Sequence, residues 1–148
     1  MYARILVATD GSELSELAVN SAIDLALLTQ AELIAVKVVH QYPASYFEGS
    51  LLLSQVEVSQ LLEHADAEAQ RVVDAVKDKA AARGVKNARA IVVNAELISE
   101  AIIEAARVHR CDLIVMASHG RRGIKRLLMG SETLHVLTHS HTPVLVLR

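Results

Sequence analysis

The chain of 148 residues is long enough for one domain with a sizeable core, and its net charge of −2 gives no field that would attract nucleic acid or an anionic membrane. Hydrophobic residues make up 52% of the chain but aromatic residues only 3%, which favours an α/β core of Ala, Val, Leu and Ile over an aromatic surface for nucleic acid. No apolar stretch is long enough to span a bilayer.

The first part of the chain alternates between strand-like and helix-like segments. An apolar strand is predicted at Arg4 to Ala8, a capped turn at residues 10–12, and a helix at Glu13 to Leu28. A second apolar strand follows at Glu32 to Val39, and the segment from Gln41 to Ser50 predicts an irregular loop. The apolar face of the predicted helix consists of Leu14, Leu17, Ala18, Ala22, Leu25 and Leu28.

The middle of the chain is dominated by one long amphipathic helix, predicted from Ser54 to Arg83 and ended by Gly84. A third strand at Ala88 to Val93, a helix at Leu97 to Val108 and a buried strand at Asp112 to Met116 follow it. The apolar stripe of the long helix consists of Val58, Leu61, Leu62, Ala65, Val72, Val73, Val76 and Ala80.

The loop after this fourth strand begins with Ala117 and contains Gly120 and, after a spacer of nine residues, Gly130 and Ser131. Glycine has no Cβ and tolerates unusual dihedral angles, so the backbone can approach a ligand closely. A helix predicted at Thr133 to Leu137 places free N–H groups and a partial positive charge behind the loop. The loop is therefore a candidate phosphate site, in which Ser131 either caps the helix or contacts a phosphate. It is not a Walker A loop, because Gly-Lys-Ser/Thr is missing at the required spacing.

Strands that alternate with helices, the last strand being Pro143 to Leu147, predict a parallel sheet with helices on both faces. Open sheets of this class bind ligands at the carboxyl ends of their strands, at the point where the strand order reverses. The first strand and the glycine-containing loop are thus the parts of the chain where a ligand is expected.

The chain resembles the universal stress proteins in three places: Ile-Leu-Val-Ala-Thr-Asp-Gly-Ser at residues 5–12, the glycine-containing loop, and Pro-Val-Leu-Val-Leu at residues 143–147. Nucleotide-binding members of that family carry Gly-x2-Gly-x9-Gly-Ser/Thr, which this chain matches except for Ala117 at the first position. The resemblance spans the whole chain and implies one domain, residues 1–148, with a three-layer α/β/α, Rossmann-like fold. Its open parallel sheet would have five strands in the order 3-2-1-4-5, with the switch between strands one and four.

The resemblance also implies a site for ATP or AMP, with or without Mg²⁺, at the carboxyl ends of strands one and four. Asp10 would accept a hydrogen bond from a ribose hydroxyl or the adenine amine, or else cap the first helix, and Val38 would line the adenine pocket. Basic residues of the spacer would neutralise phosphate charge or form a solvated face. The positions implied to contact the nucleotide are Ala8, Thr9, Asp10, Val38, Met116, Ala117, His119, Gly120, Arg121, Gly130, Ser131, Glu132 and Thr133.

The sequence predicts neither a catalytic nor a metal centre. No carboxylate or nucleophile can be placed beside His119, so a structural or ligand-contact role is preferred to that of a general base. His135, His139 and His141 lack a suitably spaced carboxylate or cysteine, and histidines at the end of a helix also suit its dipole. Cys111 starts a buried strand and is predicted to pack rather than react.

The leading interpretation is a stress-response regulatory protein that binds ATP or AMP and hydrolyses ATP slowly at most. The alternative is a dimeric interaction protein that binds no nucleotide and acts through dimerisation alone, which the replacement of glycine by Ala117 favours. An ATP-using enzyme of the α-hydrolase type would carry a Ser-Gly-Gly-type loop after the first strand, and residues 8–12 do not supply one.

The sequence also predicts a binding partner and a cellular compartment. In the strand order that the resemblance implies, the apolar strand at Val144 to Leu147 would lie at a sheet edge. It has no lysine, proline or bulge to deter pairing, so it predicts a homodimer. A further protein partner, which the sequence does not identify, is also expected. The single cysteine and a first strand close to Met1 predict a cytoplasmic protein without a signal peptide.

Overall fold

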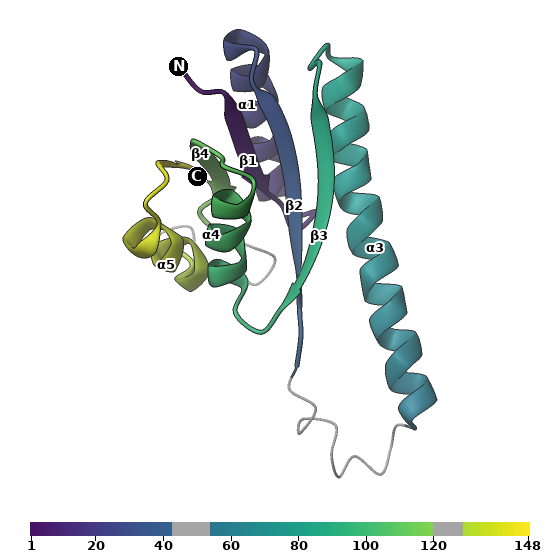
Figure 1. Ribbon diagram of the computed structural model, residues 1–148. Helices are drawn as coiled ribbons and strands as arrows, with labels where there is room; N and C mark the ends of the chain where they lie inside the picture. Colours follow the sequence, from purple (N-terminus) through teal and green to yellow (C-terminus); the bar gives the residue numbers. More distant parts are fainter. Residues whose placement is uncertain (43–53, 120–128) are drawn as a thin grey trace.

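The computed structural model describes residues 1–42, 54–119 and 129–148, and these residues form strands and helices that alternate along the chain (Figure 1). The strands are β1 (Arg4–Ala8), β2 (Glu32–His40), β3 (Ala88–Ala95), β4 (Leu113–Ala117) and β5 (Val144–Leu147). The helices are α1 (Glu13–Thr29), α3 (Gln55–Ala82), α4 (Ile98–Val108) and α5 (Ser131–His139). The loop predicted at residues 41–50 lies outside the described residues from residue 43 onward.

The strands form one parallel sheet in the order β3-β2-β1-β4-β5, which confirms the predicted order. The chain runs outward from β1 through β2 to β3, then crosses back over the sheet to β4 on the other side of β1. The strand order therefore reverses between β1 and β4, and the ends of these two strands leave a crevice for a ligand.

The two faces of the sheet are covered by different helices (Figure 1). One face of the sheet, toward α1 and α3, carries the side chains of Ile5, Val7, Leu33 and Val115. The other face, toward α4 and α5, carries those of Leu6, Ile34 and Ile114. This alternation follows from the two-residue period of a strand. Because both faces are buried, the strands read as almost continuous apolar runs, which is why the sequence located them well.

Helix ends are set by local chemistry. Ser12 caps α1 by accepting a hydrogen bond from the Ser15 N–H, and Ser54 forms a capping box with Glu57 at the start of α3. Gly84 follows α3 with φ +102°, a conformation that a residue with a Cβ rarely adopts, so it ends the helix as predicted.

The predicted apolar faces of α1 and α3 need correction. On α1, Leu17 and Leu28 are exposed, and Val19 and Ile23 are buried in their place. On α3 the buried residues are Ala69, Val73, Val76 and Ala80, while Leu61 and Leu62, nearer the start of the helix, are exposed. The first turns of α3 extend past the end of β2 in Figure 1, so the described sheet offers them no surface to cover.

Among the described residues, no helix combines the length and the apolar character needed to cross a membrane.

Candidate functional site

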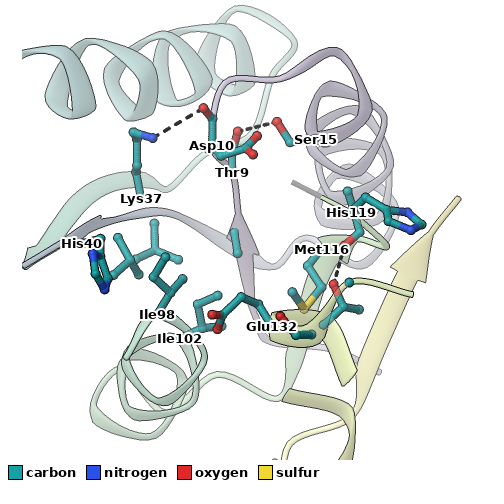
Figure 2. Close-up of a pocket in the computed structure, with 17 residues that line it drawn as sticks. Thr9, Asp10, Ser15, Lys37, His40, Ile98, Ile102, Met116, His119 and Glu132 are labelled. Atoms are coloured by element: carbon teal, nitrogen blue, oxygen red, sulfur yellow. Dashed lines mark hydrogen bonds between the residues drawn. The ribbon is translucent and has the colours of Figure 1, made fainter. Parts of the chain in front are cut away.

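A cavity of about 560 Å³ lies at the carboxyl ends of β1, β2 and β4, at the topological switch point of the sheet (Figure 2). Its volume falls within the range of about 300–1,000 Å³ that is usual for small-molecule sites. It is lined by Ala8, Thr9, Asp10, Ser15, Val36, Lys37, Val38, His40, Ile98, Ile102, Met116, Ala117, His119, Gly130, Ser131, Glu132 and Thr133.

One side of the cavity is an apolar slot. Val36 and Val38 project from β2 and Met116 from β4, on the face of the sheet that α4 covers, and Ile98 and Ile102 come from the first turns of α4. Ile98 and Ile102 are four residues apart, so they lie on the same side of the helix. The slot is suited to a flat apolar group such as a nucleobase.

Asp10 stands at the end of β1 beside the slot (Figure 2). Its carboxylate Oδ1 accepts a hydrogen bond from the Ser12 N–H (2.9 Å), and the Lys37 ammonium donates to its backbone carbonyl (3.4 Å). The cap of α1 is Ser12, so the interpretation of Asp10 as the helix cap is wrong. Asp10 instead orders the turn that precedes the helix, and the residue lines the cavity.

A short chain of hydroxyl groups lies beneath this turn. The Ser15 hydroxyl donates to the Ser12 carbonyl (2.8 Å), so it accepts a hydrogen bond from the Thr9 hydroxyl (3.0 Å). The Thr9 hydroxyl in turn accepts from the Gly11 N–H (3.2 Å). Thr9 and Ser15 are both buried, and the Thr9 proton is already donated within the protein. Thr9 therefore shapes the end of β1, and toward a ligand its hydroxyl could act only as an acceptor.

The N-terminus of α5 forms the other end of the cavity. Gly130 is the N-cap, and no side chain caps the helix there, so the prediction that Ser131 caps it is wrong. The first bond within the helix runs from the Leu134 N–H to the Gly130 carbonyl (3.0 Å), which leaves the three N–H groups before it without a partner inside the helix. These groups and the Ser131 hydroxyl are a donor set suited to an anion.

Gly130 has a φ of −61°, which any residue adopts, so conformational freedom does not explain the glycine. The reason is close approach: the Gly130 N–H donates to the Ser118 carbonyl (2.8 Å), and a Cβ on Gly130 would lie 3.1 Å from that oxygen. Thr133 tightens the same junction, because its hydroxyl lies 3.0 Å from the carbonyl oxygen of Ala117 and 3.2 Å from that of Ser118. Together these bonds hold the start of α5 against the end of β4.

His119 follows this junction. Its Nδ1 lies 2.9 Å from the Ser118 hydroxyl, and its buried Nε2 has no hydrogen-bond partner among the described residues. Among the residues that the structure describes, no carboxylate orients the imidazole as a catalytic triad requires.

The predicted contacts at Gly120 and Arg121, and the other basic residues of the spacer, lie outside the described residues.

All of the described positions that were expected to contact a nucleotide line the cavity. Sequence reasoning missed Ser15, Val36, Lys37, His40 and the two isoleucines of α4. Lys37 carried a signal, since it is a charged residue inside an otherwise apolar strand. The isoleucines carried none, because apolar residues at helical spacing predict core equally well.

Two of the three C-terminal histidines lie beside α4 and away from the cavity. His135 Nε2 lies 2.6 Å from Glu100 Oε1, and the His135 and His139 rings are stacked with centroids 4.0 Å apart. In the described ranges, no group of three His, Cys, Asp or Glu side chains could hold a metal ion.

Comparison with known proteins gives a consistent result. The chain is 34% identical to the universal stress protein MJ0531 of Methanocaldococcus jannaschii over 154 aligned residues, covering all of this chain and 83% of the relative. It is 32% identical to the universal stress protein YxiE of Bacillus subtilis over 150 aligned residues, covering both chains completely. Among solved structures, the universal stress protein UspA of Lactobacillus plantarum superposes with a TM-score of 0.83 at 27% identity, covering 99% of this chain and 98% of that one.

A universal stress protein solved in complex with cAMP shares the fold at a TM-score of 0.71 and 24% identity, covering 99% of this chain and 97% of that one. The model of the universal stress protein family matches residues 1–148. The chain is a member of the universal stress protein family.

Proposed function

We propose that this chain is a regulatory protein that binds an adenine nucleotide, AMP or ATP, in the cavity at the switch point. The observation that supports this most strongly is the combination of groups in one cavity. It contains an apolar slot, the acidic residue Asp10 and a helix N-terminus without a side-chain cap. These groups suit the base, the ribose hydroxyls and the phosphate of a nucleotide, respectively.

The residues present fit this ligand. The base would lie between Val38 and Ile102, a ribose hydroxyl would donate to Asp10, and the phosphate would accept hydrogen bonds from the start of α5. Ala117, which stands where the family motif has glycine, lines the cavity and also packs with the buried cluster beneath α1. Any Mg²⁺ would arrive bound to the phosphates, as Mg²⁺ usually does.

The role is regulatory rather than that of a dedicated enzyme. Hydrolysis of ATP needs a group that positions or deprotonates water. His119 Nδ1 contacts the Ser118 hydroxyl, and among the described residues no carboxylate orients this imidazole, so the proposal assigns no catalytic base. Slow hydrolysis remains compatible with the site. The universal stress protein solved with cAMP supports an adenine ligand in a fold of this kind, and at 24% identity the case for this chain rests on its own cavity.

The proposal includes a homodimer in the cytoplasm, a compartment that suits a chain with one free cysteine. β5 is the last strand of the sheet on its side and pairs with β4 alone among the described strands. Val144, Val146 and Leu147 pack against the two buried clusters, whereas Leu145 is exposed. Two copies related by a twofold axis would pair their β5 strands and cover this residue.

Titration calorimetry with AMP and with Mg-ATP tests the nucleotide proposal. The wild type should bind both saturably. Asp10→Asn keeps an acceptor for the Ser12 N–H but replaces a charged acceptor by a neutral one, so binding should weaken about fivefold. Gly130→Val places branched atoms against the Ser118 carbonyl and should weaken binding at least tenfold.

Leu134→Ala is the matched control on α5, because Leu134 is exposed and does not line the cavity. It should bind as the wild type does. Unchanged affinity in both Asp10→Asn and Gly130→Val would reject this placement of the nucleotide, and the absence of binding by the wild type would favour the alternative of an interaction protein without a ligand.

A further inference from the structure

The carboxylate of Glu132 caps a helix to which it does not belong. α4 begins after Leu97, whose side chain provides no capping hydrogen bond. The N–H of Ser99 in the first turn of α4 instead donates to Glu132 Oε2, at 2.8 Å, from the first turn of α5. A carboxylate at the N-terminus of a helix is favoured both by the free N–H groups and by the helix dipole.

This contact joins two neighbouring helices that both line the cavity. α4 supplies Ile98 and Ile102 to the apolar slot, and α5 supplies the N–H groups at the polar end. Ser99 lies between these isoleucines in the sequence and is itself buried. Glu132 lies beside Ile102 in Figure 2, at the boundary of the two helices.

The start of α5 is also fixed to the sheet. The Thr133 hydroxyl bonds to the carbonyls at the end of β4, so the residue next to Glu132 has little freedom to move. A carboxylate held in this way can transmit the position of α5 to α4. Loss of the contact would leave the first turn of α4 without this cap, and the wall of the slot would loosen.

We propose that Glu132 is a positioning residue for the nucleotide site, which acts by holding the slot-forming turn of α4 in register with the phosphate-binding end of α5. This inference rests on the proposed function. It assigns Glu132 to the protein's own helix N-terminus, whereas the sequence resemblance implied a contact with the nucleotide.

A direct role of the charge makes a different prediction. A carboxylate close to the bound phosphates would repel them, so its neutralisation would strengthen binding more for ATP than for AMP and would leave adenosine unaffected. A positioning role through α4 affects the base slot, which adenosine, AMP and ATP all share. The number of phosphates on the ligand therefore separates the two roles.

The experiment compares Glu132→Gln and Glu132→Ala with the wild type, using adenosine, AMP and Mg-ATP as probes in titration calorimetry. Glutamine retains a carbonyl oxygen that accepts from the Ser99 N–H, and alanine does not. Exchange of the Ser99 amide proton, followed by NMR without any ligand, reports on the cap itself. Glu104→Ala is the control, because it removes one exposed carboxylate from α4 that pairs with Arg107.

Glu132→Ala should weaken all three ligands by a similar factor of about five, the usual effect of losing a helix cap, and should speed exchange at Ser99 by a similar factor. Glu132→Gln should weaken the three ligands equally and less than the alanine variant does, because glutamine keeps the acceptor but loses the charge. Glu104→Ala should stay within twofold of the wild type for every ligand. Unchanged exchange at Leu6, in the middle of β1, shows that the alanine variant is folded.

Two results would overturn the inference. One is a gain in ATP affinity of Glu132→Gln over the wild type without a matching gain for adenosine, which would indicate a direct effect of charge on phosphate. The other is unchanged adenosine affinity in Glu132→Ala. A wild type that binds none of the three ligands would instead reject the proposed function, and the positioning role with it, while Ser99 exchange would still show whether Glu132 caps α4.

Discussion

The Ser15 hydroxyl connects the end of β1 to the first turn of α1. It donates to the Ser12 carbonyl and accepts from the Thr9 hydroxyl, and Thr9 and Ser15 are buried. Ser15→Ala would leave the Thr9 proton without its acceptor in a buried place, which should lower the free energy of unfolding by about 1–3 kcal/mol. Urea denaturation measures this loss.

Ser21→Ala is the matched control for this prediction, because Ser21 lies on the same helix and is only partly buried. It reports the gain in helix propensity that any Ser→Ala change brings. Equal stability of Ser15→Ala and Ser21→Ala would contradict the role assigned to the hydroxyl chain.

Cys111 precedes β4 and is buried, as the sequence predicted. Burial raises the pKa of its thiol from 9.0 to about 11, because the thiolate would lose its hydration. The unfolded chain then releases the thiol proton at a lower pH than the folded protein. The contribution of the Cys111 thiol to the free energy of unfolding is therefore fully present below about pH 9 and is lost as the pH rises toward about 11.

Cys111→Ala should show a smaller fall in unfolding free energy between these pH values than the wild type shows, in urea titrations at pH 7, 9 and 10.5. Other groups titrate over the same range in both proteins, so the difference between the two slopes isolates the thiol. Parallel slopes would contradict a raised pKa at Cys111.

At the scale of elements, the sequence located strands better than helix faces. Strands buried on both faces are apolar throughout, so their position does not depend on which face each residue takes. A helix face depends on where the sheet lies. The exposed Leu61 and Leu62 were predicted on the same stripe as the buried Val73 and Val76, and the sequence pattern alone does not distinguish them.

The candidate site was predictable in part for a similar reason. Asp10, Gly130 and Ser131 follow directly from strand ends and glycine spacing, which are local signals. The cap that Glu132 provides to α4 joins residues 33 positions apart in the sequence. No local pattern reports such a contact, because it depends on how the two helices pack.

The proposed dimer can be tested by a substitution in the edge strand β5. Leu145 is exposed on a strand that has a described partner on one side only, so Leu145→Lys should weaken the proposed dimer by placing a charge in the paired edge. Sedimentation equilibrium at micromolar concentration should give a dimer mass for the wild type and a lower average mass for the variant. Leu134→Lys, which places the same charge on the exposed side of α5, should remain dimeric.

A monomer mass for the wild type would reject the dimer. A dimer mass for Leu145→Lys equal to that of the wild type would show that a different surface forms it.

At the scale of the whole molecule, the topology brings the parts of the site together. The reversal of strand order between β1 and β4 opens a crevice, and the turn after β1 and the start of α5 reach it from the two halves of the chain. α4 closes the side of this crevice with an apolar wall. The combination of slot, acidic residue and helix N-terminus in one cavity is the basis for proposing an adenine nucleotide.

The central claim is that the base occupies the slot and the phosphate the start of α5. Titration of the ¹⁵N-labelled protein with AMP, followed by NMR, tests both parts in one measurement. AMP should cause saturable shifts at the amides of Val38, Ile102, Ser131 and Thr133, while adenosine should shift the first two far more than the last two. Shifts confined to other surfaces, or none up to millimolar AMP, would contradict the account.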